Sequence, residues 1–377
     1  MFAKFRQNQR VSLKLNRSAR RYFGGVLVIF IILVGLVEIM VRSNLVQQFV
    51  PFQAYGSNHI QFEIQLNKFK MFVAQNGKPN CLILGTSQSL RDIDPKVFSQ
   101  TYLDRTGNTI RCYNFSVVGA TLATTYRLGE ILIKQVHPRL LIIGTSYLDY
   151  TESREQRNDL RFEDNAWMAF QLGTPSFKGW LLEHSYAYRL LTLVSYGTPY
   201  GLDYTSVSKE IRKWKGQLSE SGYGYTDKGI NPTKTISPGY LKDYLESFGN
   251  FTVPTRDLDN LVNLVEFTQR ENGQVILVEM PYNSMMLELR DDQGQLLPVN
   301  TQINQFVMQI NTLLASIENS HQVLFWTTGH LDFIPDNGWL DLYHLNGTSS
   351  PLFSQWLAQK VVQAVQNGQI KDPGLIN

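Results

Sequence analysis

The pattern of apolar and polar positions between residues 79 and 372 alternates between two kinds of segment. Short apolar runs predict buried strands at residues 81–84, 109–113, 140–143, 275–278 and 323–326. Stretches with apolar residues three or four positions apart predict helices at residues 95–103, 122–136, 258–270, 303–317 and 352–365. Strands that alternate with helices form a parallel sheet with helices on both faces. We therefore expect an α/β domain over residues 79–372, built on a doubly wound five-stranded parallel sheet.

Two stretches depart from this alternation. Residues 150–255 are rich in Tyr, Gly and Ser, and we interpret them as a large insertion after strand three that covers the carboxyl edge of the sheet. Residues 42–78 precede the first strand and contain one amphipathic stretch of impure period, at residues 60–73. We expect residues 42–78 to form a stalk.

The N-terminal segment has a third pattern. Residues 22–37 carry no charge, and residues 38–41 extend the segment to about the 20 residues that a helix needs to cross a bilayer. Residues 1–21 hold seven Lys or Arg and no acid, so we expect a cytoplasmic basic tail at 1–21 and a transmembrane anchor at 22–41. The protein would then be single-pass in the cell membrane, with its remaining residues extracytoplasmic. A cleaved signal peptide has a shorter apolar core and a small-residue cleavage site, and a core helix would lack the flanking positive charges.

Composition narrows the function classes. The chain has 377 residues, a net charge of +3 and only two cysteines, Cys81 and Cys112. Residues 1–42 carry +7 and the remainder −4, which argues against a nucleic-acid partner. Two cysteines exclude a disulfide scaffold and a Cys-rich zinc module, and we expect no cofactor and no metal. The two cysteines fall on neighbouring strands. This position is consistent with two alternatives, a disulfide and a pair of buried free thiols.

The first candidate for chemistry is Ser87, in the sequence GTSQS that follows the first strand. Sites in parallel sheets lie at the carboxyl ends of strands, and the glycine two residues earlier permits a tight turn there. A serine in this position is either a nucleophile or the cap of the next helix.

The second candidate is the pair Asp341 and His344, which lies between the fifth strand and the last helix. An Asp three residues before a His can accept the Nδ1 hydrogen bond, which leaves Nε2 as a base for a hydroxyl. Taken alone, the pair is equally typical of a solvated loop or a helix cap. Because the first and fifth strands end at the same edge of the sheet, we expect Ser87, His344 and Asp341 to meet there.

A third candidate follows strand two, where Gly119 could present its backbone N–H to an oxyanion or could be a plain turn glycine.

The order of these motifs resembles the SGNH/GDSL hydrolase superfamily, and within it the membrane-anchored O-acylation proteins of the DltD, AlgJ and AlgX type. The most specific part is DLYHLNGTSSPLFSQWL at residues 341–357, which is similar to the family's Asp-x-x-His-Leu-Asn-x-x-Gly-x-x-x-Phe-Ser ending with a displaced glycine. The resemblance implies a flavodoxin-like sheet, Ser87 as nucleophile, His344 as base and Asp341 as its orienter. It also implies an oxyanion hole that includes the N–H groups of Ser87 and Gly119.

The chain departs from the family in the third motif, which normally supplies an Asn in a Gly-x-Asn-Asp pattern. Here the sequence is GTSYLD at residues 144–149, so Ser146 takes the Asn position as the expected third oxyanion donor. Asp149 either binds substrate or caps a helix. The candidate substrate-binding residues are Gln88, Asn114, Asp149 and Asn346.

Together these features predict a membrane-tethered extracytoplasmic serine esterase or O-acyltransferase that acts on acyl groups of a cell-envelope polysaccharide or related polymer. The resemblance implies a multi-spanning membrane acyltransferase of the MBOAT type as donor-side partner and a carbohydrate polymer as acceptor. The missing Asn keeps an alternative open, a catalytically impaired scaffold or glycan-binding protein of an envelope acylation complex.

Overall fold

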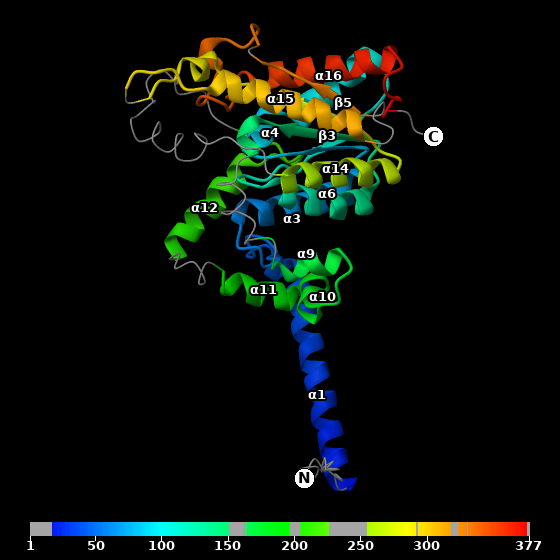
Figure 1. The fold of residues 1–377 in the computed structure, drawn as a ribbon. Helices are drawn as coiled ribbons and strands as arrows, with labels where there is room; N and C mark the ends of the chain where they lie inside the picture. Colours follow the sequence, from blue (N-terminus) through cyan, green and yellow to red (C-terminus); the bar gives the residue numbers. More distant parts are fainter. Residues whose placement is uncertain are drawn as a thin grey trace, which may run out of the picture.

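The computed structural model describes residues 17–150, 162, 164–196, 204–225, 255–291, 293–317, 323–329 and 331–374, with side chains from residue 22 onward. Within these residues, five parallel strands form one sheet in the order β2-β1-β3-β4-β5 (Figure 1). The strands are β1 (Cys81–Leu84), β2 (Cys112–Asn114), β3 (Leu140–Thr145), β4 (Gln274–Glu279) and β5 (Val323–Trp326). This order is that of a flavodoxin-like sheet, so the predicted fold class is confirmed.

Alternate residues of each strand point to opposite faces of the sheet and build two separate cores. Leu82 and Leu84 of β1 face one core, which is covered by α3 (Ile60–Asn76), α6 (Leu122–Val136), α14 (Thr255–Arg270) and α15 (Val299–Ser316). Cys81 and Ile83 face the other, which is covered by α5 (Pro95–Thr106) and α16 (Ser350–Gln366). The sheet is therefore buried on both faces, as a doubly wound arrangement requires.

The predicted stalk is wrong for residues 60–76. They form α3, whose residues Phe62, Leu66 and Phe69 are at most 1% exposed and pack on the sheet. The helical period of α3 is impure because polar residues are buried as well: Gln61, Glu63 and Gln65 are also at most 1% exposed. The α/β unit therefore begins before β1, with α3 as part of its core.

The predicted position of the insertion over the carboxyl edge is also wrong for three of its described helices, which are α9 (Ala166–Gln171), α10 (Phe177–His184) and α11 (Tyr186–Val194). The fourth, α12 (Tyr204–Gln217), shares a hydrophobic cluster with Leu90, in the helix that follows β1 at this edge. In Figure 1, α9, α10 and α11 lie beyond α3 and α6, beside the upper end of α1 (Arg17–Arg42), and α12 packs on α3. Residues 218–225 reach the carboxyl end of β2, where the Asn114 N–H donates to the Ser221 carbonyl at 2.9 Å, and the Gly224 N–H donates to the Leu90 carbonyl at 2.8 Å. The rest of the predicted insertion, including residues 226–254, lies outside the described residues.

The N-terminal helix α1 is long and apolar enough to cross a membrane. Its segment Tyr22–Arg42 has a mean hydropathy of 2.8, and only 6% of its most apolar window is buried. Because its side chains are exposed, α1 is not a core helix of the described domain. A membrane anchor and a signal sequence both have these properties.

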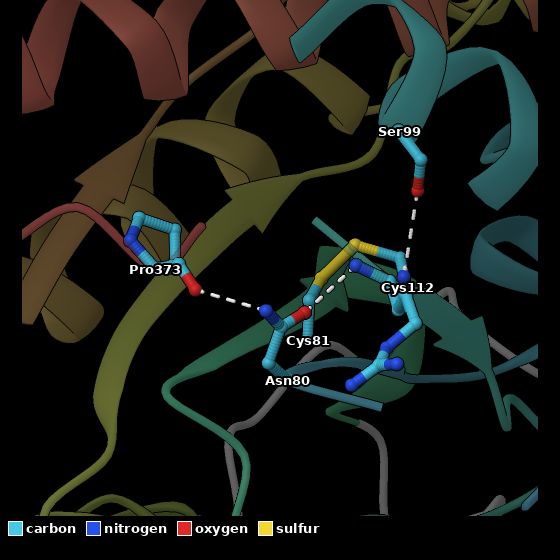
Figure 2. The surroundings of a disulfide bond; sticks show 6 residues. Asn80, Cys81, Ser99, Cys112 and Pro373 are labelled. Atoms are coloured by element: carbon cyan, nitrogen blue, oxygen red, sulfur yellow. Dashed lines mark hydrogen bonds between the residues drawn. A yellow bond between two sulfur atoms is a disulfide. The ribbon is translucent and has the colours of Figure 1, made fainter. Parts of the chain in front are cut away.

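Of the two alternatives for the cysteines, the structure contains the disulfide. Cys81 and Cys112 open β1 and β2 side by side, with their Cα atoms 4.4 Å apart (Figure 2). Asn80, next to the bond, accepts from the Arg111 N–H at 2.7 Å and donates to the Pro373 carbonyl at 3.0 Å. Stable disulfides are typical of proteins in oxidising compartments outside the cytosol.

Candidate active site

Ser87 is the first residue of α4 (Ser87–Asp92), at the carboxyl end of β1. Gly85, two residues earlier, has φ +151°, and a Cβ there would lie 2.2 Å from Ser89 Oγ and 2.5 Å from the Gly144 carbonyl oxygen. A glycine is therefore required for the turn that places Ser87 at the sheet edge. Thr86 occupies the N-cap position and makes no side-chain hydrogen bond to the first turn of α4, so Ser87 does not serve as the cap.

His344 lies in a short loop at residues 339–345, within the segment that joins β5 to α16. Trp339 and Leu345 pair as an isolated antiparallel bridge, which closes the loop at its base. Asp341 Oδ1 accepts from the backbone N–H groups of Tyr343, at 2.9 Å, and His344, at 2.8 Å. The Asp341 carboxylate thus shapes the backbone that presents the imidazole.

Ser87, His344 and Asp341 are joined by hydrogen bonds. His344 Nε2 lies 2.9 Å from Ser87 Oγ, and His344 Nδ1 lies 2.8 Å from Asp341 Oδ2. Since a carboxylate only accepts, Nδ1 carries the proton and Nε2 is left to accept the Ser87 hydroxyl proton. His344 is 7% exposed, whereas Ser87 is half-buried and can be reached from solvent.

The electrostatics of the loop keep Asp341 ionised. Burial by itself would raise the pKa of this carboxyl, but the charge and hydrogen bond of His344, together with two backbone N–H groups, lower the pKa below its ordinary value. A negative carboxylate at neutral pH stabilises an imidazolium on His344.

Helix α4 also holds the loop that carries His344. Gln88 Nε2 donates to the Tyr343 carbonyl at 2.8 Å, and Asp92 Oδ1 accepts from the Leu345 N–H at 2.8 Å. The helix that begins with Ser87 is therefore hydrogen-bonded to the backbone on both sides of His344. Gln88 is 3% exposed, and its bond to the loop replaces the predicted role in substrate binding.

Sequence reasoning missed Asp92 and Arg91, which lie next to the loop. Asp92 is fully buried, and this burial, reinforced by the nearby Asp341 charge, raises its pKa well above the ordinary value, against the opposing charge of Arg91. Arg91 also interacts with the Asp341 charge. The sequence did contain a signal for them. Residues 91 and 92 follow Ser87 by four and five positions, about one helical turn, so a helix that begins at Ser87 carries them close to it.

The loop after β2 approaches the same edge. The Val117 N–H donates to the Gly85 carbonyl at 3.0 Å, which holds this loop against the turn before Ser87. Gly119 has φ +67°, a left-handed conformation that glycine adopts without strain. Within the described part of the chain, the N–H of Gly119 has no hydrogen-bond acceptor, so it is free for a ligand.

Ser146 does not take the position of a third oxyanion donor. Its hydroxyl donates to Asp149 Oδ2 at 3.3 Å, its N–H donates to the same oxygen at 2.9 Å, and the pair forms a capping box on the short helix η1 (Tyr147–Asp149). Of the two roles left open for Asp149, capping is therefore the observed one. Both side chains are at most 5% exposed and are hydrogen-bonded to each other, so the predicted donor role of Ser146 is wrong.

Two other candidate substrate-binding residues serve the backbone instead. Asn114 donates to the carbonyl groups of Ser89, at 2.7 Å, and Ile93, at 3.0 Å, and is fully buried. Asn346 accepts from the Thr348 N–H at 3.0 Å and is 1% exposed. Both predictions are wrong because these amides have no remaining contact with solvent and fix the loops that surround the site.

Comparisons with known proteins add little to this geometry. No protein-family model matches the chain, and no curated protein matches its sequence. Among solved structures, it is similar to a salicylyl-acyltransferase, SsfX3, from a tetracycline biosynthetic pathway, with 11% identity and a TM-score of 0.36; the match covers 79% of this chain and only 56% of the other. It is also similar to a protein assigned as an arylesterase from Agrobacterium tumefaciens str. C58, with 11% identity, a TM-score of 0.32, and coverage of 75% and 98%. Such distant matches carry no argument about function.

Proposed function

We propose that this chain is a membrane-anchored serine esterase or O-acyltransferase in which Ser87 is the nucleophile, His344 the general base and Asp341 its orienter. The observation that carries the proposal is the continuous hydrogen-bond chain, 2.9 Å from Ser87 to His344 and 2.8 Å from His344 to Asp341. These distances lie within the range needed for proton transfer.

The reaction follows from the protonation states of the three groups. Ser87 Oγ attacks the carbonyl carbon of an acyl donor while His344 Nε2 takes the hydroxyl proton, and Asp341 stabilises the resulting imidazolium. The imidazolium then gives the proton to the leaving oxygen as the bond to the donor breaks, which leaves an ester on Ser87. In the second half, His344 takes a proton from an acceptor hydroxyl or from water as that oxygen attacks the ester carbonyl carbon, and the imidazolium then returns the proton to Ser87 Oγ as the acyl–serine bond breaks.

The negative oxygen of the intermediate needs donors that are already in position. The N–H groups of Ser87 and Gly119 are the two candidates, because α4 lacks a side-chain cap and Gly119 has no acceptor among the described residues. Each well-placed donor of this kind contributes about 10²–10³ in rate.

The side of the membrane and the substrate class belong to the same proposal. Seven cationic residues precede the apolar segment that begins at Tyr22, and a disulfide follows that segment in the sheet; both favour an extracytoplasmic domain. For such a domain we propose a cell-envelope polysaccharide or related polymer as acyl acceptor and an MBOAT-type membrane acyltransferase as donor-side partner, as the motif resemblance implies.

Hydrolysis of p-nitrophenyl acetate by the full chain in detergent micelles tests the enzyme proposal. We expect activity that is lost in His344→Ala and kept in His137→Ala, whose exposed imidazole pairs with Glu271. Loss of activity in both variants, or in neither, would count against His344 as the base.

The competing function is an impaired scaffold or glycan-binding protein of an envelope acylation complex. It is favoured by one observation, the commitment of the Ser146 hydroxyl to Asp149, which leaves the proposed oxyanion hole one donor short of the family pattern. A folded full chain without any esterase or fluorophosphonate reactivity would favour this alternative.

A further inference from the structure

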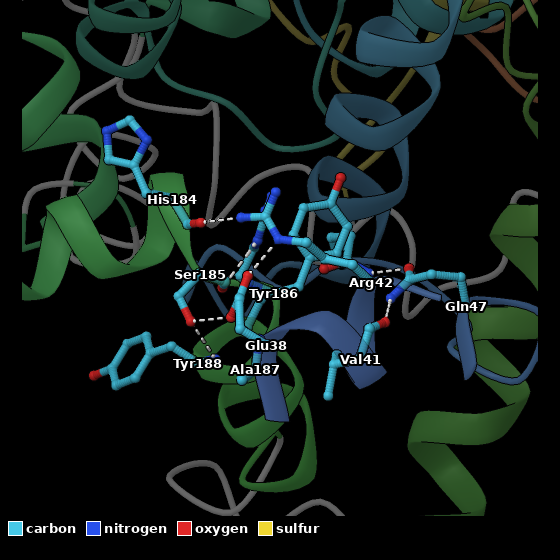
Figure 3. Close-up of polar contacts among 11 residues, drawn as sticks. Glu38, Val41, Arg42, Gln47, His184, Ser185, Tyr186, Ala187 and Tyr188 are labelled. Atoms are coloured by element: carbon cyan, nitrogen blue, oxygen red, sulfur yellow. Dashed lines mark hydrogen bonds and ion pairs between the residues drawn. The ribbon is translucent and has the colours of Figure 1, made fainter. Parts of the chain in front are cut away.

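The end of α1 is fastened to the start of α11 through Glu38 (Figure 3). The Glu38 carboxylate accepts from Ser185 Oγ at 2.8 Å, from the Tyr186 N–H at 2.8 Å and from the Ala187 N–H at 3.1 Å. These are donors of the first turn of α11, which a carboxylate stabilises by capping and by charge. A side chain of the apolar N-terminal helix therefore caps a helix of the insertion.

Arg42, one turn further along α1, makes a second set of contacts with the same helices. Its Nη2 donates to the His184 carbonyl at the end of α10 at 2.7 Å, and its Nε donates to Glu38 at 2.7 Å. The guanidinium also lies 4.7 Å from the centre of the Tyr186 ring. The last turn of α1 thus holds the junction between α10 and α11.

This junction lies at the depth where α1 leaves the lipid. A helix rises about 1.5 Å per residue and a hydrocarbon core is about 30 Å thick, so about 20 residues cross it. Counted from Tyr22, where the described apolar segment begins, the span ends near residue 41. Glu38 lies within the last turn of that span, and the first turn of α11 must lie at the same level as Glu38.

Both helices at this level expose large apolar side chains. Phe177 and Trp180 of α10 are 76% and 46% exposed and stack on each other, while Leu191 and Val194 of α11 are 63% and 77% exposed. In Figure 1, α10 and α11 flank the upper end of α1. A bilayer surface adjoins this position, and Trp and Phe are side chains that favour the interface between lipid and water.

We propose that α10 and α11 are interfacial membrane helices, which insert Phe177, Trp180, Leu191 and Val194 into the leaflet that α1 leaves. This inference rests on α1 as the membrane anchor proposed above. The contact directs the side of the α/β domain that carries α3 and α6 toward the bilayer and gives the sheet edge with Ser87 a fixed orientation to the membrane. The occupant is lipid, and a protein partner on the same helices is the competing outcome.

A single-cysteine depth measurement tests this proposal. Both native cysteines are in the disulfide, so a new cysteine is the only free thiol of the chain. The full chain carrying Val194→Cys, and separately Leu191→Cys, is labelled with a nitrobenzoxadiazole dye and reconstituted into vesicles of phosphatidylcholine and phosphatidylglycerol. The comparison variants are Ile31→Cys, in the middle of α1, and Met308→Cys, which is 62% exposed on α15, a helix at the end of the molecule away from α1 in Figure 1.

The expected result separates the three positions. The dye at residue 194 or 191 loses about half of its fluorescence to phosphatidylcholine with a nitroxide at carbon 5, a quencher near the headgroup boundary. The dye at residue 31 is quenched best by a nitroxide at carbon 12, and the dye at residue 308 responds to aqueous iodide alone.

Two results would overturn the proposal. If residues 191 and 194 respond to iodide as residue 308 does, while residue 31 is in lipid, the helices are not interfacial and a protein partner is left as their occupant. If residue 31 also responds to iodide, the anchor itself is wrong. Fluorophosphonate labelling of Ser87 in the same samples reports on the enzyme proposal independently.

Discussion

Gln88, the residue after Ser87, donates its side-chain amide to the backbone carbonyl of Tyr343, the residue before His344, at 2.8 Å. The neighbours of the proposed nucleophile and base are thus bonded directly, although 255 positions separate them in the chain. The separation between Ser87 Oγ and His344 Nε2 is therefore set mainly by α4 and its contacts with the loop.

Gln88→Ala should lower both activity and stability. Loss of this amide leaves the Tyr343 carbonyl without its donor and lets the loop shift, and a displacement of about 1 Å can cost about 10²-fold in rate. We expect kcat for p-nitrophenyl acetate to fall about 10- to 100-fold, with a loss of about 1–3 kcal/mol in unfolding free energy. Gln100→Ala, on the surface of α5, is the matched control and should leave kcat unchanged. Wild-type kcat in Gln88→Ala would show that the loop holds its position without α4.

Ser146→Ala distinguishes a cap from an oxyanion donor. Because the hydroxyl is bonded to Asp149, we expect its removal to cost about 1 kcal/mol of stability and to change kcat by less than about threefold. An oxyanion donor would cost about 10²–10³ in kcat. Thr121→Ala, which removes the N-cap of α6, provides the reference for a pure capping loss in a thermal unfolding assay. A large fall in kcat with little loss of stability would contradict the capping role and indicate that Ser146 is an oxyanion donor.

The sheet could be predicted because its strands are short apolar runs between helices whose periods are regular. Residues 81–84 and 122–136 have the predicted bounds, and β2 begins later than predicted because the N–H of Arg111 bonds to the Asn80 side chain. α3 was missed as core because periodicity treats polar residues as exposed. Gln65 and Glu63 are buried there, because Gln65 donates to the backbone of Asn114 and Glu63 accepts from the backbone N–H of Tyr55.

Part of the site could be predicted because it depends on short spacings and on the order of the strands. The spacing of Asp341 and His344 encodes a local hydrogen bond, and the shared sheet edge brings Ser87 to them. The four candidate substrate-binding residues were chosen for their position beside these motifs, and the structure uses all four to hydrogen-bond backbone groups. The contacts of Glu38 with α11 join residues about 150 positions apart and have no local signal in the sequence.

Glu63 should make the protein less stable as the pH rises. Its full burial raises its pKa from 4.5 to about 7, although Tyr55 and Ser57 donate three hydrogen bonds to it. A carboxyl whose pKa is higher in the folded state stabilises the fold below the ordinary pKa and loses that contribution as the pH rises through 7. We expect unfolding free energy to fall by about 3 kcal/mol between pH 5 and pH 8 from this group. The denaturant midpoint of Glu63→Gln should lose this part of its pH dependence. A midpoint that changes with pH as much as that of the wild type would contradict the assignment.

The disulfide should contribute to stability through the loop that it closes. Cys81 and Cys112 are 31 residues apart, and closing a loop of that length in the unfolded chain corresponds to about 3–4 kcal/mol. Reduction with a phosphine should therefore lower the guanidinium midpoint of the wild-type protein. The double variant Cys81→Ala and Cys112→Ala should not respond to the reductant. A wild-type midpoint that reduction leaves unchanged would show that the bond does not stabilise the fold.

Labelling with a fluorophosphonate, read by mass spectrometry of the full chain and its peptides, tests the nucleophile most directly. The account predicts one adduct on the Ser87 peptide of the wild type, none in Ser87→Ala, and a rate at least about 10³-fold lower in His344→Ala. Ser195→Ala, on the exposed end of α11, should label as the wild type does. An adduct of undiminished yield in Ser87→Ala would contradict the account, because the reactive hydroxyl would then belong to another residue.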